Sequence, residues 1–182
     1  MEHTRPPSST ISGRPGDDEI AAYAKPYIDL VAGDDAIGAL VAQRRQTVLL
    51  IESLDEERVR GLTYAPGKWT LKEVLGHIAD DERIYTYRAL CIARGDTAPL
   101  PSFDENRYVA AAGFEARPLA SLLADYRAVR QATITLLEGL PAEAWRRRGV
   151  VCDYTTSVRG LAFHIAGHEL RHLRVVREKY LR

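Results

Sequence analysis

WTLKEVLGHIADDERIYTYRALCIAR, residues 69–94, carries the strongest helical pattern in the chain. Thr70 is followed three positions later by Glu73, which is the spacing of a capping box at a helix N-terminus. Trp69 and Val74 occupy the two positions of a hydrophobic staple around that cap. Apolar residues then recur every three or four positions, and we expect one long amphipathic helix over this stretch.

Three further segments show the same periodicity, at residues 34–53, 118–138 and 157–180. Each begins with a residue suited to a helix N-terminus: Asp34 or Asp35, Pro118, and Ser157. Strands do not alternate with these helices, so an α/β fold is not expected. Four amphipathic helices of similar length predict an all-α protein, a four-helix bundle.

The ends and connections are less regular. Residues 1–16 are polar and rich in Pro and Ser, which predicts a flexible arm. Residues 17–31 show a short helical pattern interrupted by Pro26, so the expected domain covers residues 17–182. For residues 95–117 we expect a long solvated connection, with a lid over the site as the alternative.

Two smaller features are expected in the other connections. The segment between the first two long helices contains a helical turn at residues 55–59. After the third long helix, Pro141 predicts a short helix through Trp145, and residues 150–152 predict a short extended piece. These pieces are too short to change the fold class.

Composition excludes several classes of function. The chain has 182 residues, of which 46% are hydrophobic and 27% charged, the balance of a globular domain. Lys+Arg and Asp+Glu are both 25, so no net field attracts nucleic acid or an anionic membrane. Cys91 and Cys152 come without a secretion signal or a membrane span, which predicts a cytoplasmic protein with reduced, structural thiols.

The histidines are the most informative residues. In the last long helix the ladder of inward positions, with steps of three and four, includes both His168 and His172. Two buried imidazoles one turn apart on one face are the geometry that metal-binding helices use. His164 also precedes His168 by four, but His164 and His172 are roughly 12 Å apart along the axis, too far to share one ion. The ladder favours His168 with His172.

A third ligand is expected from residues 69–94. His77 lies there beside the apolar stripe, with Asp81 one turn later and Glu82 on the stripe itself. An acid at such a position is an outer partner of an imidazole, a fourth ligand, or one end of a buried ion pair. The alternative to a metal site is a buried polar network that only fixes helix register.

Two segments give the chain a specific resemblance. Residues 64–77, YAPGKWTLKEVLGH, and residues 165–173, IAGHELRHL, together match the pattern of the DinB-like superfamily, which the chain resembles from about Asp17 to Leu181. The resemblance implies an up-down-down-up bundle that holds one divalent ion through His77, His168 and His172. His164 has no counterpart in that triad. The ion implied is one of several, among them Zn, Ni, Mn and Fe.

The resemblance also implies candidate activities. Related proteins include S-transferases and isomerases that activate a low-molecular-weight thiol such as mycothiol or bacillithiol, which suggests a thiol and an electrophilic substrate as partners here. Glu82 or Asp81 would then orient a ligand imidazole or move a proton. Arg88 would grip a carboxylate on thiol or substrate, the alternative being a surface ion pair with Glu82 or another acid.

Two other functions remain open. A metal with free coordination positions also supports hydrolysis, with a nearby carboxylate as general base. The third hypothesis is a non-catalytic bundle in which the ion is a staple or a sensor. In that case the short N-terminal helical segment and the apolar faces would serve formation of a homodimer.

Overall fold

The structure, a computed structural model, describes residues 13–182. Most of the predicted flexible arm, residues 1–16, lies outside this part. Within it, Arg14 donates hydrogen bonds to the carbonyl oxygens of Ile28 and Val31, at 2.8 and 2.7 Å. No helix of the described residues is long and apolar enough to span a membrane.

Four long helices build the bundle: α2 (Ala36–Glu52), α4 (Leu71–Ala93), α6 (Leu119–Glu138) and α7 (Val158–Val175), the last extended by a π-helical turn at Val176–Tyr180. The shorter elements are α1 (Lys25–Ile28), α3 (Glu56–Val59), α5 (Glu105–Ala112) and the strands β1 (Arg148–Val151) and β2 (Tyr154–Ser157). Single 3-10 turns lie at Asp17–Glu19, Ala22–Ala24, Phe114–Ala116 and Ala142–Arg146.

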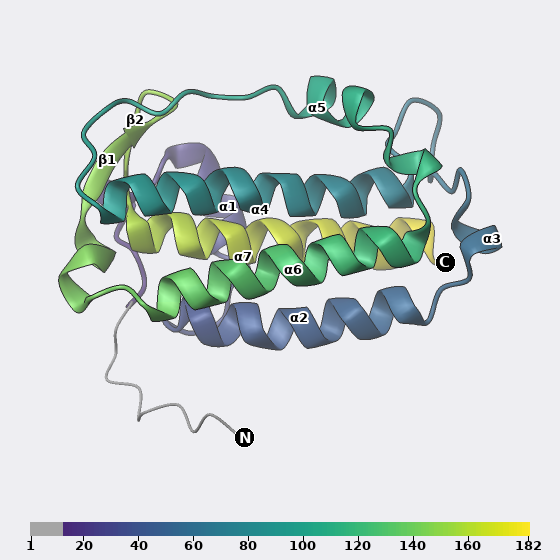
Figure 1. The fold of residues 1–182 in the computed structure, drawn as a ribbon, viewed down its shortest axis with the longest axis horizontal. Helices are drawn as coiled ribbons and strands as arrows, with labels where there is room; N and C mark the ends of the chain where they lie inside the picture. The colour runs from purple at the N-terminus through teal and green to yellow at the C-terminus, as the bar shows by residue number, and fades with distance from the viewer. Residues whose placement is uncertain (1–12) are drawn as a thin grey trace.

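The four long helices run up, down, down and up. Figure 1 shows α2 and α7 pointing one way and α4 and α6 the other. Around the bundle, α4 packs against α6 and α7, and α2 packs against the same two helices. Because α4 and α6 are parallel neighbours, the chain between them must return along the whole bundle. The predicted four-helix bundle is confirmed.

Side-chain caps fix where the long helices begin. Thr70 and Glu73 form the expected capping box of α4: the Glu73 carboxylate accepts from the Thr70 N–H at 2.7 Å, and the Thr70 hydroxyl accepts from the Glu73 N–H at 3.2 Å. Asp35 caps α2 and Ser157 caps α7 with one hydrogen bond each, accepted from the backbone N–H of Gly38 and of Gly160. These side chains satisfy amide groups that have no partner within the helix.

The long connection between α4 and α6 contains more structure than the sequence predicted. Asp104 caps the short helix α5, which lies over α4 (Figure 1). The second strand β2 was also not predicted. It pairs with β1 through a turn at Cys152 and Asp153, whose φ angles of 50° and 68° suit a tight hairpin.

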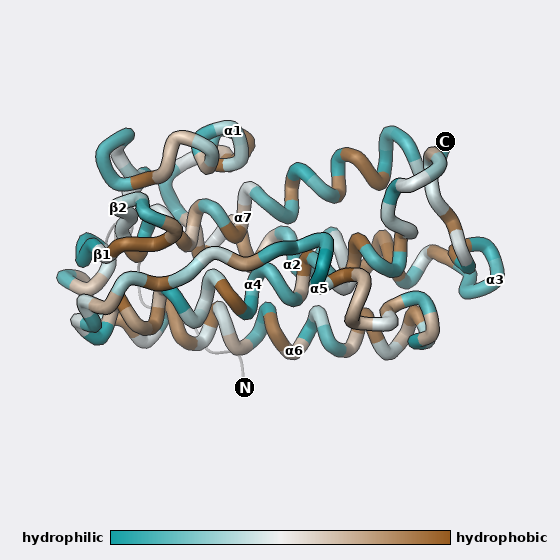
Figure 2. The backbone as a smooth tube through the Cα atoms, turned by 90° about the horizontal axis from the view of Figure 1, so that it is seen from above, coloured by the Kyte–Doolittle hydropathy of each residue, from teal (hydrophilic) through white to brown (hydrophobic). Residues whose placement is uncertain are grey.

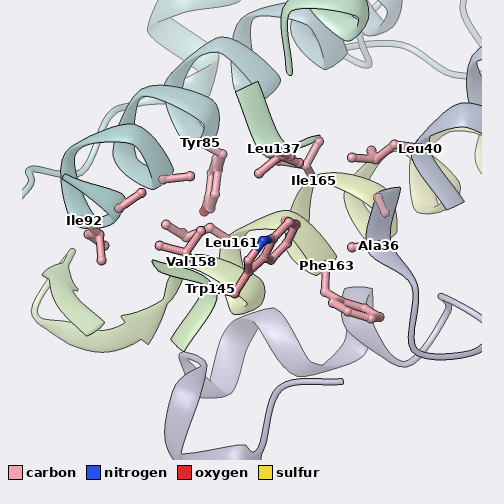
Figure 3. Close-up of a cluster of buried hydrophobic side chains, with 14 of the residues drawn as sticks. Ala36, Leu40, Tyr85, Ile92, Leu137, Trp145, Val158, Leu161, Phe163 and Ile165 are labelled. Carbon is pink, nitrogen blue, oxygen red and sulfur yellow. The ribbon is translucent and has the colours of Figure 1, made fainter. Parts of the chain in front are cut away.

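Two apolar clusters fill the two ends of the bundle. One, shown in Figure 3, surrounds Trp145 and Phe163, and the other surrounds Leu122 and Tyr126. Along each long helix, hydrophobic and hydrophilic residues are interspersed (Figure 2). This pattern lets one face of the helix be buried while the other stays polar. Between the clusters the four helices bury polar side chains instead: Gln43, Thr47, His77, Asp81, Glu82, Arg130, His168 and Glu169. This central polar layer contains the candidate site.

Candidate metal centre

Three imidazoles meet in the central layer. His77 comes from α4, and His168 and His172 come from successive turns of α7. The Nε2 atom of His168 lies 3.1 Å from Nε2 of His77 and 3.1 Å from Nε2 of His172. The three ligand atoms all lie within 4.8 Å of one another. The structure therefore brings together the three histidines named from the sequence.

These nitrogens have the chemistry that a divalent ion requires. Burial lowers the pKa of His77 to about 3 and that of His172 to about 4, and it lowers the pKa of His168 well below its usual value. All three rings are thus neutral near pH 7 and each offers a lone pair. Two nitrogens bound to one ion at about 2.1 Å stand roughly 3.0–3.4 Å apart, which matches the observed separations. The donor set fits a divalent metal.

Asp81 lies behind one of the three rings. Its Oδ2 is 3.2 Å from Nδ1 of His168, on the side of the imidazole away from the other histidines. Within residues 13–182 this oxygen accepts no aligned hydrogen bond. Burial raises the pKa of the Asp81 carboxyl to about 8, which the positive charge of Arg88 partly offsets. Asp81 is placed to orient the His168 ring.

Glu82 is one end of a buried ion pair, which is one of the three roles considered for it from the sequence. Its two carboxylate oxygens accept hydrogen bonds of 2.8 Å from Nε and Nη2 of Arg130, on α6. Arg130 also binds Glu169 on α7, which in turn accepts from Tyr126 at 2.7 Å and from Thr47. Glu82 does not line the cavity described below, so the structure offers no contact through which it would act on a substrate.

A cavity of about 430 Å³ opens beside the three histidines. Five Tyr, Trp or Phe rings line it, and they come from the N-terminal segment, the stretch just before α4, α4 itself and the connection between α4 and α6: Tyr23, Tyr27, Trp69, Tyr85 and Phe103. A volume of this size suits a small organic molecule rather than a polymer. His77, His168 and His172 line this space, so they would hold an ion at its wall.

His164 and Arg88 lie further along the cavity wall. The His164 ring stacks on Tyr85 with ring centres 4.0 Å apart, and it does not join the three convergent nitrogens.

Arg88 is only 2% exposed, so the surface ion pair considered from the sequence is wrong. Its Nη2 instead donates to the carbonyl oxygen of Pro101 at 2.6 Å. The sequence pattern could not reveal this burial because Arg88 is covered by the distant connection.

Comparison with known proteins agrees with this architecture. A family model described as the DinB superfamily matches residues 39–176. Among solved structures, YfiT from Bacillus subtilis, described as a probable metal-dependent hydrolase with an unusual four-helix bundle topology, matches with a TM-score of 0.67. The identity is 17%, and the match covers 92% of this chain and 91% of that one, so the likeness concerns the fold. No curated protein matches the sequence.

Proposed function

The chain belongs to the DinB superfamily, and from this premise we propose that it binds one divalent metal ion through His77, His168 and His172 and uses it on a small molecule. The observation that carries the proposal is the convergence of three neutral Nε2 atoms beside a cavity. Three protein ligands leave coordination positions free, which distinguishes a catalytic ion from a closed structural one.

We propose thiol-dependent transfer or isomerisation as the reaction class. A bound divalent ion would lower the pKa of a small thiol and supply a thiolate at neutral pH. The chain's own residues would perform the remaining tasks. Asp81 positions His168, and the aromatic walls around Tyr27 and Trp69 exclude water from the thiol and from an electrophilic substrate.

Metal content tests the first part of the proposal. Elemental analysis of the untagged wild type should give about one ion per chain, and His168→Ala should give none. His164→Gln is the matched control, because it changes a buried histidine of the same helix outside the convergent set. Wild-type protein that refuses added Zn, Ni, Mn and Fe would make the histidines a polar network, and the enzyme proposals would end there.

Thiol binding tests the reaction class. In cobalt-substituted protein, a thiol that binds the ion adds a charge-transfer band, so we expect mycothiol, bacillithiol, cysteine or glutathione to change the spectrum. No spectral change with any of these thiols would count against thiol-dependent chemistry while leaving the metal site intact.

Hydrolysis is the second candidate. It is favoured by the buried carboxyl group of Asp81 beside the histidines, whose raised pKa suits proton transfer near neutral pH, and by the description of YfiT as a probable metal-dependent hydrolase. Metal-loaded protein should then cleave a member of a panel of esters, amides and phosphate esters, and His168→Ala should not. If no compound of the panel is cleaved and the cobalt spectrum changes with thiol, the results would favour thiol chemistry over hydrolysis.

A further inference from the structure

Arg88 is a buried cation that forms no direct ion pair among residues 13–182. Its Nη2 is engaged by Pro101 and lies 3.5 Å from Sγ of Cys152, whereas Nη1 is buried and has no hydrogen-bond partner. A guanidinium stays protonated at any physiological pH, so it cannot relieve its burial by losing a proton. Burying a charge without pairing it is unfavourable. The unbonded Nη1 can therefore take a hydrogen-bond acceptor, and an anionic one best, from a ligand.

The guanidinium is held in a fixed orientation on the cavity wall. Its central carbon lies 4.7 Å from the ring centre of Tyr85 and 5.7 Å from that of Phe103. The N–H groups of a guanidinium lie along its edge, so the hydrogen bond that Nη1 still lacks must be made at that edge. A planar edge with one free nitrogen matches a planar carboxylate group.

Arg88 and the three histidines line the same cavity. On α4, Arg88 follows His77 by three helical turns, so both side chains share a face, roughly 16 Å apart along the axis at the backbone. Three ring-to-ring steps connect the histidines with Arg88 through side chains: 5.8 Å from His168 to His164, 4.0 Å to Tyr85 and 4.7 Å to the guanidinium. A small molecule with one group at each end can span this distance.

A second unsatisfied polar atom lies on this path. Nδ1 of His164 is buried and has no hydrogen-bond partner among the described residues. Two acids, Asp81 and the exposed Glu105, also line the cavity. Negative charge on these acids repels an anion elsewhere in the cavity, so Arg88 is the lining residue that favours an anionic group.

We propose that Arg88 binds the terminal carboxylate of an elongated small molecule whose other end reaches the three histidines. The substrate or thiol is thus a carboxylic acid with its reacting group several bonds from the carboxylate. This assignment rests on the proposed metal function for the far end of the ligand. The carboxylate subsite itself stands on the geometry of Arg88.

Matched ligands test the subsite in cobalt-loaded protein. Mercaptopropionate, mercaptohexanoate and mercaptoundecanoate, each beside the corresponding mercapto-alcohol, vary the span and the charge separately. We expect one of the longer acids to bind at least about tenfold more tightly than its alcohol, the effect of one charge-assisted hydrogen bond. Arg88→Gln should remove this preference. Arg83→Gln, on the same helix outside the cavity, should keep it.

The failure of each proposal is recognisable. Equal binding of acid and alcohol at every length, with a clear cobalt spectrum, overturns the carboxylate subsite and spares the metal function. If no thiol binds the ion, the carboxylate subsite can be tested without the metal. Calorimetry then compares the binding of hexanoate and of hexanamide to metal-free protein. A preference for hexanoate that Arg88→Gln abolishes supports the subsite, and equal affinities overturn it.

Thermal melting separates binding from a structural role. Arg88 forms no direct ion pair in the described residues, so its replacement breaks none. Arg88→Met should therefore melt within a few degrees of the wild type while losing the preference for carboxylates. A variant that melts far below the wild type and still prefers the acid to the alcohol would make Arg88 a structural residue, and the proposal would fall.

Discussion

Asp81 lies 3.2 Å behind Nδ1 of His168, one of the three proposed metal ligands. A carboxylate behind a ligating imidazole fixes its tautomer and orientation, and its loss typically lowers metal affinity about 10- to 100-fold. We therefore expect Asp81→Ala to weaken metal binding by that factor, as measured by competition with a chelator. Asp81→Asn, which keeps a hydrogen-bond acceptor at the same place, should recover part of the loss.

Asp80 is the matched control for this substitution. It is the preceding residue, and its carboxylate pairs with Arg83 on the outer side of α4, at 3.1 Å. Asp80→Asn should leave the metal affinity unchanged. Equal affinities for the wild type and Asp81→Ala would show that Asp81 does not position His168.

The buried imidazoles couple the stability of the metal-free protein to pH. Burial lowers the pKa of His77 and of His164 to about 3 and that of His172 to about 4. An unfolded chain titrates its histidines near pH 6.5, so below this value it binds more protons than the folded state. The free energy of unfolding therefore falls as the pH falls, by up to about 1.4 kcal/mol per pH unit for each histidine.

Asp81 acts in the opposite sense, because burial raises its pKa to about 8 and stability is lost as the pH rises toward that value. One such group does not cancel three histidines. We expect the denaturation midpoint of metal-free protein to fall between about pH 7 and about pH 5, and His164→Gln to reduce the slope. A midpoint independent of pH over this range would contradict the buried neutral state of the rings.

At the scale of elements, α1 lies on the outside of α7 (Figure 2). Its residue Tyr27 lines the cavity. The contact of α1 with α7 depends on Gly167, since a Cβ atom there would lie 2.1 Å from the carbonyl oxygen of Tyr27. The backbone of α1 would have to move, and overpacking of this kind costs about 1–3 kcal/mol. We expect Gly167→Ala to lower the unfolding free energy by this amount in chemical denaturation.

Gly139 offers a control for the same substitution. It ends α6 with an ordinary helical φ of −82°, and an added Cβ would find its nearest neighbour at 3.5 Å. Gly139→Ala should therefore be nearly neutral. If Gly167→Ala were equally neutral, α1 would not be packed on α7 as closely as the structure shows.

The network around Arg130 performs a different task from the three histidines beside it. It joins Glu82 of α4 to Glu169 of α7 through one guanidinium of α6. Glu82 adjoins Asp81, and Glu169 adjoins His168, so each helix presents a ligand-side residue and a network residue side by side. The network holds the register of the helices on which the ligand geometry depends.

For the whole molecule, a bound ion would join α4 to α7 across the centre of the bundle. A ligand that binds only the folded state stabilises it by about 2.7 kcal/mol at a free concentration one hundred times its dissociation constant. We expect the melting temperature to rise with added metal and His168→Ala to abolish the rise. An unchanged melting temperature on metal removal would exclude a role of the ion as a structural staple.

The sequence alone was sufficient to predict the fold class and three convergent residues. The helical spacing, the Thr70–Glu73 capping box and the ladder through His168 and His172 are local patterns, and local patterns survive in the folded chain because each helix buries the face they define. The positions of α2, α4, α6 and α7 were predicted within a few residues for this reason.

Only the tertiary structure decided which polar residues share the site. Glu82 and Asp81 are neighbours in sequence, yet a helix turns successive residues by about 100°, so one faces Arg130 and the other His168. Arg88 became part of the cavity because the connection with Pro101 and Phe103 covers it. Such contacts join residues far apart in the chain, and no periodicity in the sequence records them.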